Sequence, residues 1–252
     1  MWRYPEDDSP TVITAAYNIA STHRTGEALH LPETAVLFFV GSGVEYLRDH
    51  TSCELITEKF PRFLRACPIY RLGEVCFLHG GSGAPHAVDT LETLAALGVK
   101  RVFSVGMCGA FSERVGLGDI IVPNRAYVEE GTSLHYYPEI DYSEPDSRLF
   151  QQLCAIPGAK ALPVVSTDAV YRQTFYKEKL WRGKGAVGVD METSALLSVG
   201  KYLGIQAASV LMVSDIHPMD KTAPRWEWSM TAEMRRRLFE TSISAIWAAE
   251  TD

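Results

Sequence analysis

Residues 185–215, GAVGVDMETSALLSVGKYLGIQAASVLMVSD, decide the fold that the sequence predicts. Their apolar runs predict a strand, a helix and a second strand. Glu192 lies where the first strand turns into the helix, and Asp215 lies just past the end of the second strand. In a parallel sheet these two strand ends face the same crevice, where open α/β folds bind ligands. The stretch therefore predicts an active site with one acid to hold a polar ligand and another to move a proton.

Other apolar runs repeat this alternation along the chain. Strands are predicted around 34–40, 63–70, 74–78, 101–105, 118–128 and 161–166, and a long amphipathic helix is predicted over 226–249. A helix that ends before Gly98 follows the usual stop signal. We expect a polar arm over 1–22 and one domain over 23–252. Its fold class is α/β, a three-layer α/β/α sandwich with a mixed, mostly parallel central sheet.

Composition limits the kinds of partner. The 252 residues carry a net charge of −7, which disfavours nucleic acid and anionic membranes as partners. The five cysteines are odd in number and form no CxxC pair, so we expect neither a disulfide framework nor a metal site. No signal peptide or membrane-spanning run is visible, and we expect a cytoplasmic protein without a cofactor.

Three glycine-containing turns follow predicted strands: GSG at 41–43, GGSG at 80–83 and GMCG at 106–109. Each turn alone is explained by a tight strand-to-helix connection, but three at successive strand ends favour a shared cleft. None matches the phosphate-binding P-loop, and GSGVEY lacks the third glycine of a dinucleotide fingerprint. A nicotinamide-dependent dehydrogenase is therefore disfavoured.

Four segments in order give the chain a family resemblance: GSGAPHAVDTLETLAALG at 81–98, GMCGAF…VGLGDIIVP at 106–123, EGTSLHYYP at 130–138, and VDMETSALL at 189–197 with VSD at 213–215. Over roughly 23–245 the chain resembles the nucleoside phosphorylase family, which includes uridine phosphorylase, the hexameric purine nucleoside phosphorylases and methylthioadenosine nucleosidase. The resemblance implies an enzyme that separates ribose from a nucleobase. It also implies a homodimer, or a hexamer built from dimers, with shared active sites.

The resemblance gives roles to individual residues. Glu192 would accept hydrogen bonds from the ribose hydroxyls, with Met191 packed under the sugar. Asp215 would protonate a purine at N7, assisted by Arg225 from a closing loop. His23 would reach a neighbouring subunit's site and bind the 5′-hydroxyl. The alternatives are a helix-start carboxylate at Glu192, a helix cap at Asp215 and a solvated histidine at position 23.

The resemblance also bears on the base. Cys108 and Gly109 match the purine version of their turn, and Val170 stands where a stacking phenylalanine is usual, with Tyr171 beside it. The glutamine and arginine that read uracil are not in register. A purine nucleoside or a 5′-modified analogue is therefore favoured.

The chain departs from the family pattern at the phosphate pocket. A G-D-P-x-R turn would follow the first strand, but this chain has Gly41 to Glu45, with the acid where the arginine belongs. A second phosphate arginine is replaced by Ser104, and a phosphate-binding hydroxyl is replaced by Met107. A phosphate dianion needs cationic or charge-assisted partners.

Arg62 or Arg65 is the candidate for a remaining phosphate arginine across a subunit interface. Nucleosidases of the family also lack these arginines, so Glu45 could orient or deprotonate a water molecule, or simply point outward from a helix. Water is favoured over phosphate as the nucleophile. A phosphorylase with a rebuilt phosphate site, and a nucleoside-binding protein without catalysis, remain the alternatives.

Overall fold

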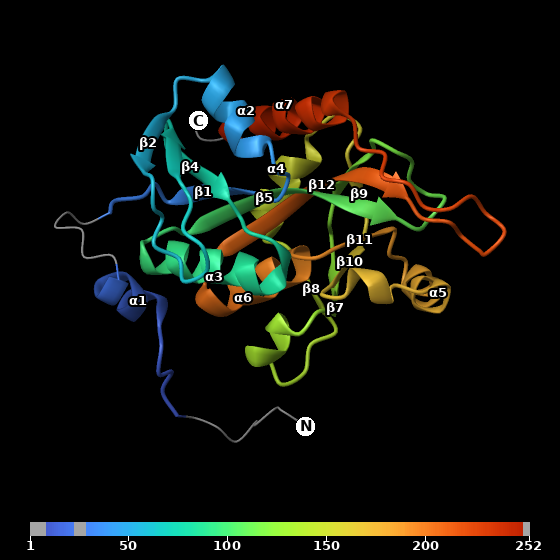
Figure 1. Ribbon diagram of the computed structural model, residues 1–252, viewed down its shortest axis with the longest axis horizontal. Helices are drawn as coiled ribbons and strands as arrows, with labels where there is room; N and C mark the ends of the chain where they lie inside the picture. Colours follow the sequence, from blue (N-terminus) through green and yellow to red (C-terminus); the bar gives the residue numbers. More distant parts are fainter. Residues whose placement is uncertain (1–8, 23–28, 249–252) are drawn as a thin grey trace.

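The computed structural model describes residues 9–22 and 29–248. It has one central sheet with helices on both sides, as Figure 1 shows. The helices are α1 (Ala15–Thr22), α2 (Gly43–His50), α3 (Gly83–Ala96), α4 (Ser147–Cys154), α5 (Phe175–Gly183), α6 (Thr193–Leu203) and α7 (Ala232–Ala248), with short 3-10 turns at Thr132–His135 and Val170–Arg172. The predicted single-domain α/β/α sandwich is confirmed.

The sheet has a parallel centre and mixed edges. Its strands are β1 (Thr34–Phe38), β2 (Glu54–Thr57), β3 (Ile69–Leu72), β4 (Val75–His79), β5 (Arg101–Ala110), β6 (Ile120–Val122), β7 (Ala126–Glu129), β8 (Tyr142–Ser143), β9 (Lys160–Ala161), β10 (Val164–Thr167), β11 (Gly188–Asp190) and β12 (Gln206–Ile216). Strands β4, β1, β5 and β12 run parallel side by side. Their carboxyl ends therefore meet at one edge of the sheet.

Strand β11 runs against the expected direction. It pairs antiparallel with the end of β5, with Gly188 opposite Ala110 and Val189 opposite Gly109. Since β12 occupies one edge of β5 along its whole length, β1 and β11 share the other edge in succession. The prediction that both strands of the 185–215 stretch are parallel is thus wrong, although the turn after β11 still reaches the carboxyl ends of the central strands.

Two hydrophobic layers hold the helices on the sheet. On one face, alternate residues of β1 and β5 pack with α2, α4 and α7, where Leu47, Leu153 and Phe239 are fully buried. On the other face, the intervening strand residues pack with α3 and α6 through Leu91 and Leu196. The uninterrupted burial of β1 explains why its sequence is apolar at every position after Thr34.

Some predicted elements begin or end elsewhere. Helix α7 starts at Ala232 rather than 226, because the Thr231 hydroxyl accepts a hydrogen bond from Met234 N at 3.2 Å and so caps the helix. Residues 118–128 form two short strands rather than one. Part of the predicted arm is helical: α1 packs beside α3, and Asn18 Nδ2 donates to Pro61 O at 3.0 Å. Across the described segments, every helix is too short or too polar to cross a bilayer.

Candidate active site

A pocket of about 850 Å³ opens where the parallel strands end. Its walls come from the segments after β1 and β4, from the carboxyl ends of β5 and β12, from β11, and from the segment that leads into α5. The volume lies within the usual range for small-molecule sites. Two of the three glycine turns, at 80–83 and 106–109, contribute to it, while the turn at 41–43 does not.

Glu192 is held at the start of α6 by two backbone amides. Gly83 N donates to its Oε1 at 2.7 Å, and its Oε2 accepts from Met191 N at 3.3 Å. The first contact joins the glycine turn after β4 to α6, which are 109 residues apart. Burial and the nearby charge of Asp190 outweigh these hydrogen bonds and raise the pKa of Glu192 to about 8.

Asp190 stabilises the turn between β11 and α6. It accepts hydrogen bonds from Ser166 Oγ at 2.5 Å, from Thr193 N at 3.1 Å and from the Thr193 hydroxyl. Burial raises its pKa against the effect of these bonds. Because Asp190 caps the first turn of α6, Glu192 is left available to face the pocket.

Asp215 lines the same pocket near the end of β12. Ser214 Oγ donates to its Oδ1 at 2.5 Å, and Trp226 Nε1 donates to its Oδ2 at 2.6 Å. His217 Nε2 lies 3.2 Å from the same Oδ2. Burial disfavours the carboxylate, but the hydrogen bonds from His217, Ser214 and Trp226 outweigh it, so the pKa of Asp215 falls below its usual value. A general acid works best with a pKa raised toward the working pH, so this shift runs against the role predicted for Asp215.

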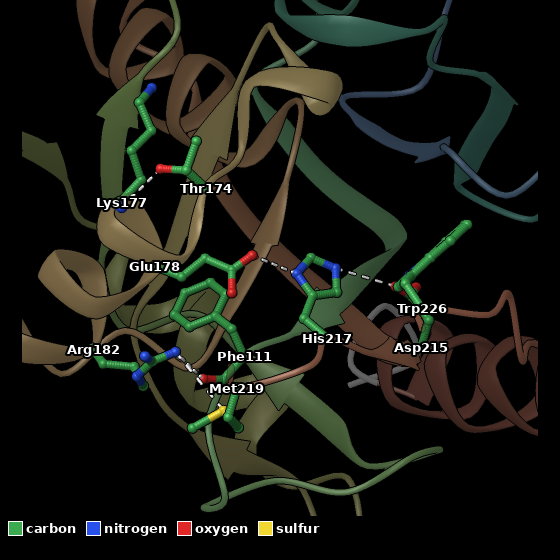
Figure 2. A network of polar contacts seen from close by, with 9 residues as sticks. All are labelled: Phe111, Thr174, Lys177, Glu178, Arg182, Asp215, His217, Met219 and Trp226. Atoms are coloured by element: carbon green, nitrogen blue, oxygen red, sulfur yellow. Dashed lines mark hydrogen bonds and ion pairs between the residues drawn. The ribbon is translucent and has the colours of Figure 1, made fainter. Parts of the chain in front are cut away.

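His217 is the centre of a row of charges, shown in Figure 2. Its Nδ1 lies 2.7 Å from Glu178 Oε1 on α5, while its Nε2 faces Asp215. Burial lowers the pKa of the imidazole, but hydrogen bonds and charge from Asp215 and Glu178 outweigh it and raise that pKa to about 9. The histidine is therefore an imidazolium at neutral pH.

Gly109 makes this arrangement sterically feasible. A Cβ atom at this position would lie 2.3 Å from His217 Nε2 and 2.9 Å from Asp215 Oδ2. Both distances are shorter than real contacts, so any side chain at position 109 would displace the acid or the imidazole. Residues 106–109 were predicted to be a turn, but they are the last part of strand β5 and bring its backbone directly against the two charged groups.

The structure brings together most of the residues that the sequence predicted for sugar and base. Met191 and Glu192 line one side of the pocket. The residues expected near the base, namely Cys108, Gly109, Val170, Tyr171 and Asp215, line it as well. His23 lies outside the described residues.

Arg225 is not part of the pocket wall. It is exposed in the loop before α7, whereas the next residue, Trp226, lines the pocket and bonds to Asp215. The position expected to assist the acid is therefore filled by an indole N–H rather than a guanidinium.

The residues expected to bind the nucleophile lie outside the wall, apart from Met107. Gly41 is exposed, and Glu45 on α2 pairs with His79 Nε2 at 3.1 Å. Ser104 is buried between β5 and β12, where its hydroxyl donates to Ser209 Oγ at 2.6 Å. Glu45 and Ser104 therefore contact other residues of the chain and do not line the pocket.

The two candidate phosphate arginines are also placed elsewhere. Arg62 is buried and donates to Arg65 O, His79 O and Thr90 Oγ1 at 2.7 to 2.9 Å. Its guanidinium therefore stabilises the fold around the segment after β4. Arg65 is exposed, with a positive φ of 38°.

Sequence reasoning missed Glu178, His217, Trp226 and Trp228, all of which line the pocket. His217 comes two residues after Asp215, and that proximity was a usable signal. Glu178 is 39 residues from its histidine, so only the packing of α5 reveals the pair.

Acidic side chains outnumber basic ones in the pocket wall. Four acidic side chains line it, those of Glu178, Asp190, Glu192 and Asp215. Over the described ranges His217 is its sole basic side chain, since the lining includes no lysine or arginine. Within the same ranges no three His, Cys, Asp or Glu side chains are grouped to hold a metal ion.

A family model described as the phosphorylase superfamily matches residues 35–244, most of the chain. The chain belongs to this superfamily, whose members include nucleoside-cleaving enzymes. The family resemblance predicted from the sequence is thereby confirmed.

Curated relatives align over part of their length. The chain is 29% identical over 142 residues to a DeoD-type purine nucleoside phosphorylase of Alkaliphilus metalliredigens, covering 54% of this chain and 61% of the relative. It is 28% identical over 145 residues to a guanosine phosphorylase of Halorubrum lacusprofundi, covering 53% and 57%. The alignments thus span less than two thirds of these two relatives.

Solved structures of the superfamily share the fold. A purine nucleoside phosphorylase from Toxoplasma gondii superimposes with a TM-score of 0.73 at 18% identity, covering 85% of this chain and 90% of that one. An AMP nucleosidase from Bacteroides thetaiotaomicron gives 0.72 at 21% identity, covering 95% and 100%. At these identities the likeness shows the fold alone.

Proposed function

We propose that this member of the phosphorylase superfamily cleaves the N-glycosidic bond of a purine nucleoside, or of a 5′-modified analogue, with water as the nucleophile. One observation carries the proposal: Glu192 and Asp215 line the same pocket from two separate elements, next to the turn at Cys108 and Gly109. Glu192 binds the ribose diol, and Asp215 faces the departing base.

The charge of the wall supports this reaction. Glycoside cleavage develops positive charge on the sugar, and acidic side chains held in the wall of a pocket stabilise such charge where they are ionised. Asp190 and Glu192 lie together at the ribose end.

The same charge pattern favours water over phosphate. A phosphate dianion would meet four acidic side chains, of which Asp215 is held ionised, and one imidazolium that is already paired on both nitrogens. With no lysine or arginine in the described lining, phosphate would lack the charge-assisted bonds it needs.

The preference for a purine rests on the apolar and aromatic residues of the pocket wall. Val170, Tyr171, Trp226 and Trp228 offer surfaces on which a flat heterocycle can pack. The curated relatives named above are a purine nucleoside phosphorylase and a guanosine phosphorylase.

The test is incubation of the protein with a panel of purine and pyrimidine nucleosides, with and without phosphate. Free base and free ribose without phosphate support the proposal. Sugar phosphate formed only when phosphate is present would establish a phosphorylase instead. Binding seen by calorimetry without turnover would establish a nucleoside-binding protein.

We also propose a homodimer, or a hexamer of dimers, in which His23 completes a neighbouring site. Light scattering measures the assembly. If the sites are shared, mixing the two inactive variants His23→Ala and Asp215→Asn under subunit exchange restores part of the activity. If each site is built from one chain, the mixture stays inactive.

A further inference from the structure

The row Glu178, His217, Asp215 is buried at the base end of the pocket. Their side chains are 7%, 14% and 5% exposed. The three come from α5, from the segment just after β12 and from β12 itself. Two acids on opposite nitrogens of one imidazole keep it charged and fix its orientation.

This row bears directly on how the base could be protonated. Both oxygens of Asp215 already accept hydrogen bonds, Oδ1 from Ser214 and Oδ2 from Trp226 and His217. A carboxylate surrounded by donors is ionised and has no proton to give. A leaving purine nevertheless needs one proton, so a second group must carry it.

We propose that His217, held through Nδ1 by Glu178, is the proton carrier of the site and supplies through Asp215 the proton that the departing base takes up. This inference rests on the proposed function. Because Glu178 engages Nδ1, the proton released is the one on Nε2, which faces Asp215 Oδ2. Glu178 is thus a positioning residue for the imidazole.

The step balances. The bond from C1′ to the base breaks, and its electron pair goes to the base. The water oxygen bonds to C1′, and one water proton leaves to solvent. The base gains one proton at a ring nitrogen, His217 loses one from Nε2, and Asp215 ends as the carboxylate it was. Solvent then returns a proton to His217 before the next turnover.

Other charged groups nearby do not replace this carrier. Burial and the charges of Asp190 and Asp215 raise the pKa of the Cys108 thiol, so it stays neutral. Arg182, one turn along α5 from Glu178, donates to Phe111 O at 3.0 Å and contacts Met219 Sδ at 3.8 Å (Figure 2). Lys177 on the same helix pairs with Glu129 at 3.3 Å.

The first experiment is the pH dependence of kcat and KM for the wild type, Glu178→Gln and His217→Gln. In the wild type, kcat falls as pH rises through about 9, because His217 loses its proton there. Glu178→Gln moves this fall to lower pH. His217→Gln lowers kcat by about 100-fold and abolishes the fall, with KM within a few-fold of wild type.

The matched control is Glu129→Gln, which makes the same change at another acid that contacts α5, through Lys177 and Trp181. It should keep the wild-type pH profile. A profile in Glu178→Gln that also matches the wild type would overturn the proposal. So would a kcat in His217→Gln equal to that of the wild type.

A second measurement is independent of turnover. Nitrogen NMR of the imidazole follows the protonation of His217 directly, and Glu178→Gln should lower its midpoint by at least one pH unit. An unchanged midpoint would refute the role of Glu178. If the wild type cleaves no nucleoside, the proposed function fails, and this titration still decides whether the row holds a charged imidazole.

Discussion

Two glutamate–histidine pairs in the described part of the chain differ in what surrounds them. His79 faces Glu45 at 3.1 Å near the turn after β1, with side chains 30% and 44% exposed. His217 faces Glu178 at 2.7 Å and has a second acid, Asp215, on its other nitrogen, all within the buried wall. The hydrogen bonds and charges of two carboxylates outweigh the effect of burial at His217, so this histidine stays charged at neutral pH.

The largest effect on catalysis is expected from replacing Asp215, the second acid that contacts His217 and that has no counterpart at His79. Asp215→Asn should lower kcat by about 10²- to 10⁴-fold, because the amide cannot pass a proton to the base. Nucleoside affinity should change little, since Glu192 still binds the ribose. Steady-state kinetics and calorimetry on one preparation measure both. Equal activity in the variant would remove Asp215 from the mechanism.

The buried pair should also appear in the pH dependence of stability. The folded pKa of His217, about 9, lies above the ordinary 6.5. Its contribution is therefore fully present below pH 6.5 and is lost as pH rises through 9. The contribution of His217 to the free energy of unfolding that is lost in this way is on the order of 3 kcal/mol. Urea unfolding near neutral and alkaline pH should show a larger loss for the wild type than for His217→Gln. Equal losses would contradict the assignment.

Glu192, at the ribose end of the pocket, belongs to neither pair and so serves as a comparison for both. Above pH 8, where Glu192 is ionised, Glu192→Gln should raise KM by about 10- to 100-fold, because a charge-assisted bond to the diol is lost. A 2′-deoxynucleoside should suffer less from this substitution than a ribonucleoside. If both substrates lose affinity equally, Glu192 does not contact the 2′-hydroxyl.

The smallest effect is expected at the exposed pair. His79→Gln should change the free energy of unfolding by less than about 1 kcal/mol, since exposed ion pairs contribute little. A loss as large as that of His217→Gln would show that burial does not account for the difference between the pairs.

Much of the fold was readable from the sequence because its signals are local. Apolar runs marked β1, β5 and β12, and Gly98 marked the end of α3. Strand β11 was assigned the wrong direction, because three residues carry no information about the partner they pair with. Helix α7 was predicted too long, because the tryptophans before it match a helical pattern but one of them bonds to Asp215.

The site was readable where a motif spans adjacent residues, as for Met191, Glu192 and Asp215. It was not readable where the partner comes from another element. Glu178 was unremarkable in its own helix, and its role depends on how α5 packs beside the end of β12. Arg62 looked like a phosphate ligand, but its three hydrogen bonds within the chain became visible only in three dimensions.

Gly109 has a consequence for how this pocket can diverge. Since a methyl group there would overlap both His217 and Asp215, the three positions cannot drift independently. A variant with alanine at 109 must first move or lose the imidazole of His217. Conversely, a variant without that imidazole no longer needs glycine at 109. Substitutions at 109 and 217 should therefore be strongly non-additive. A library that redesigns this enzyme should randomise the two codons together.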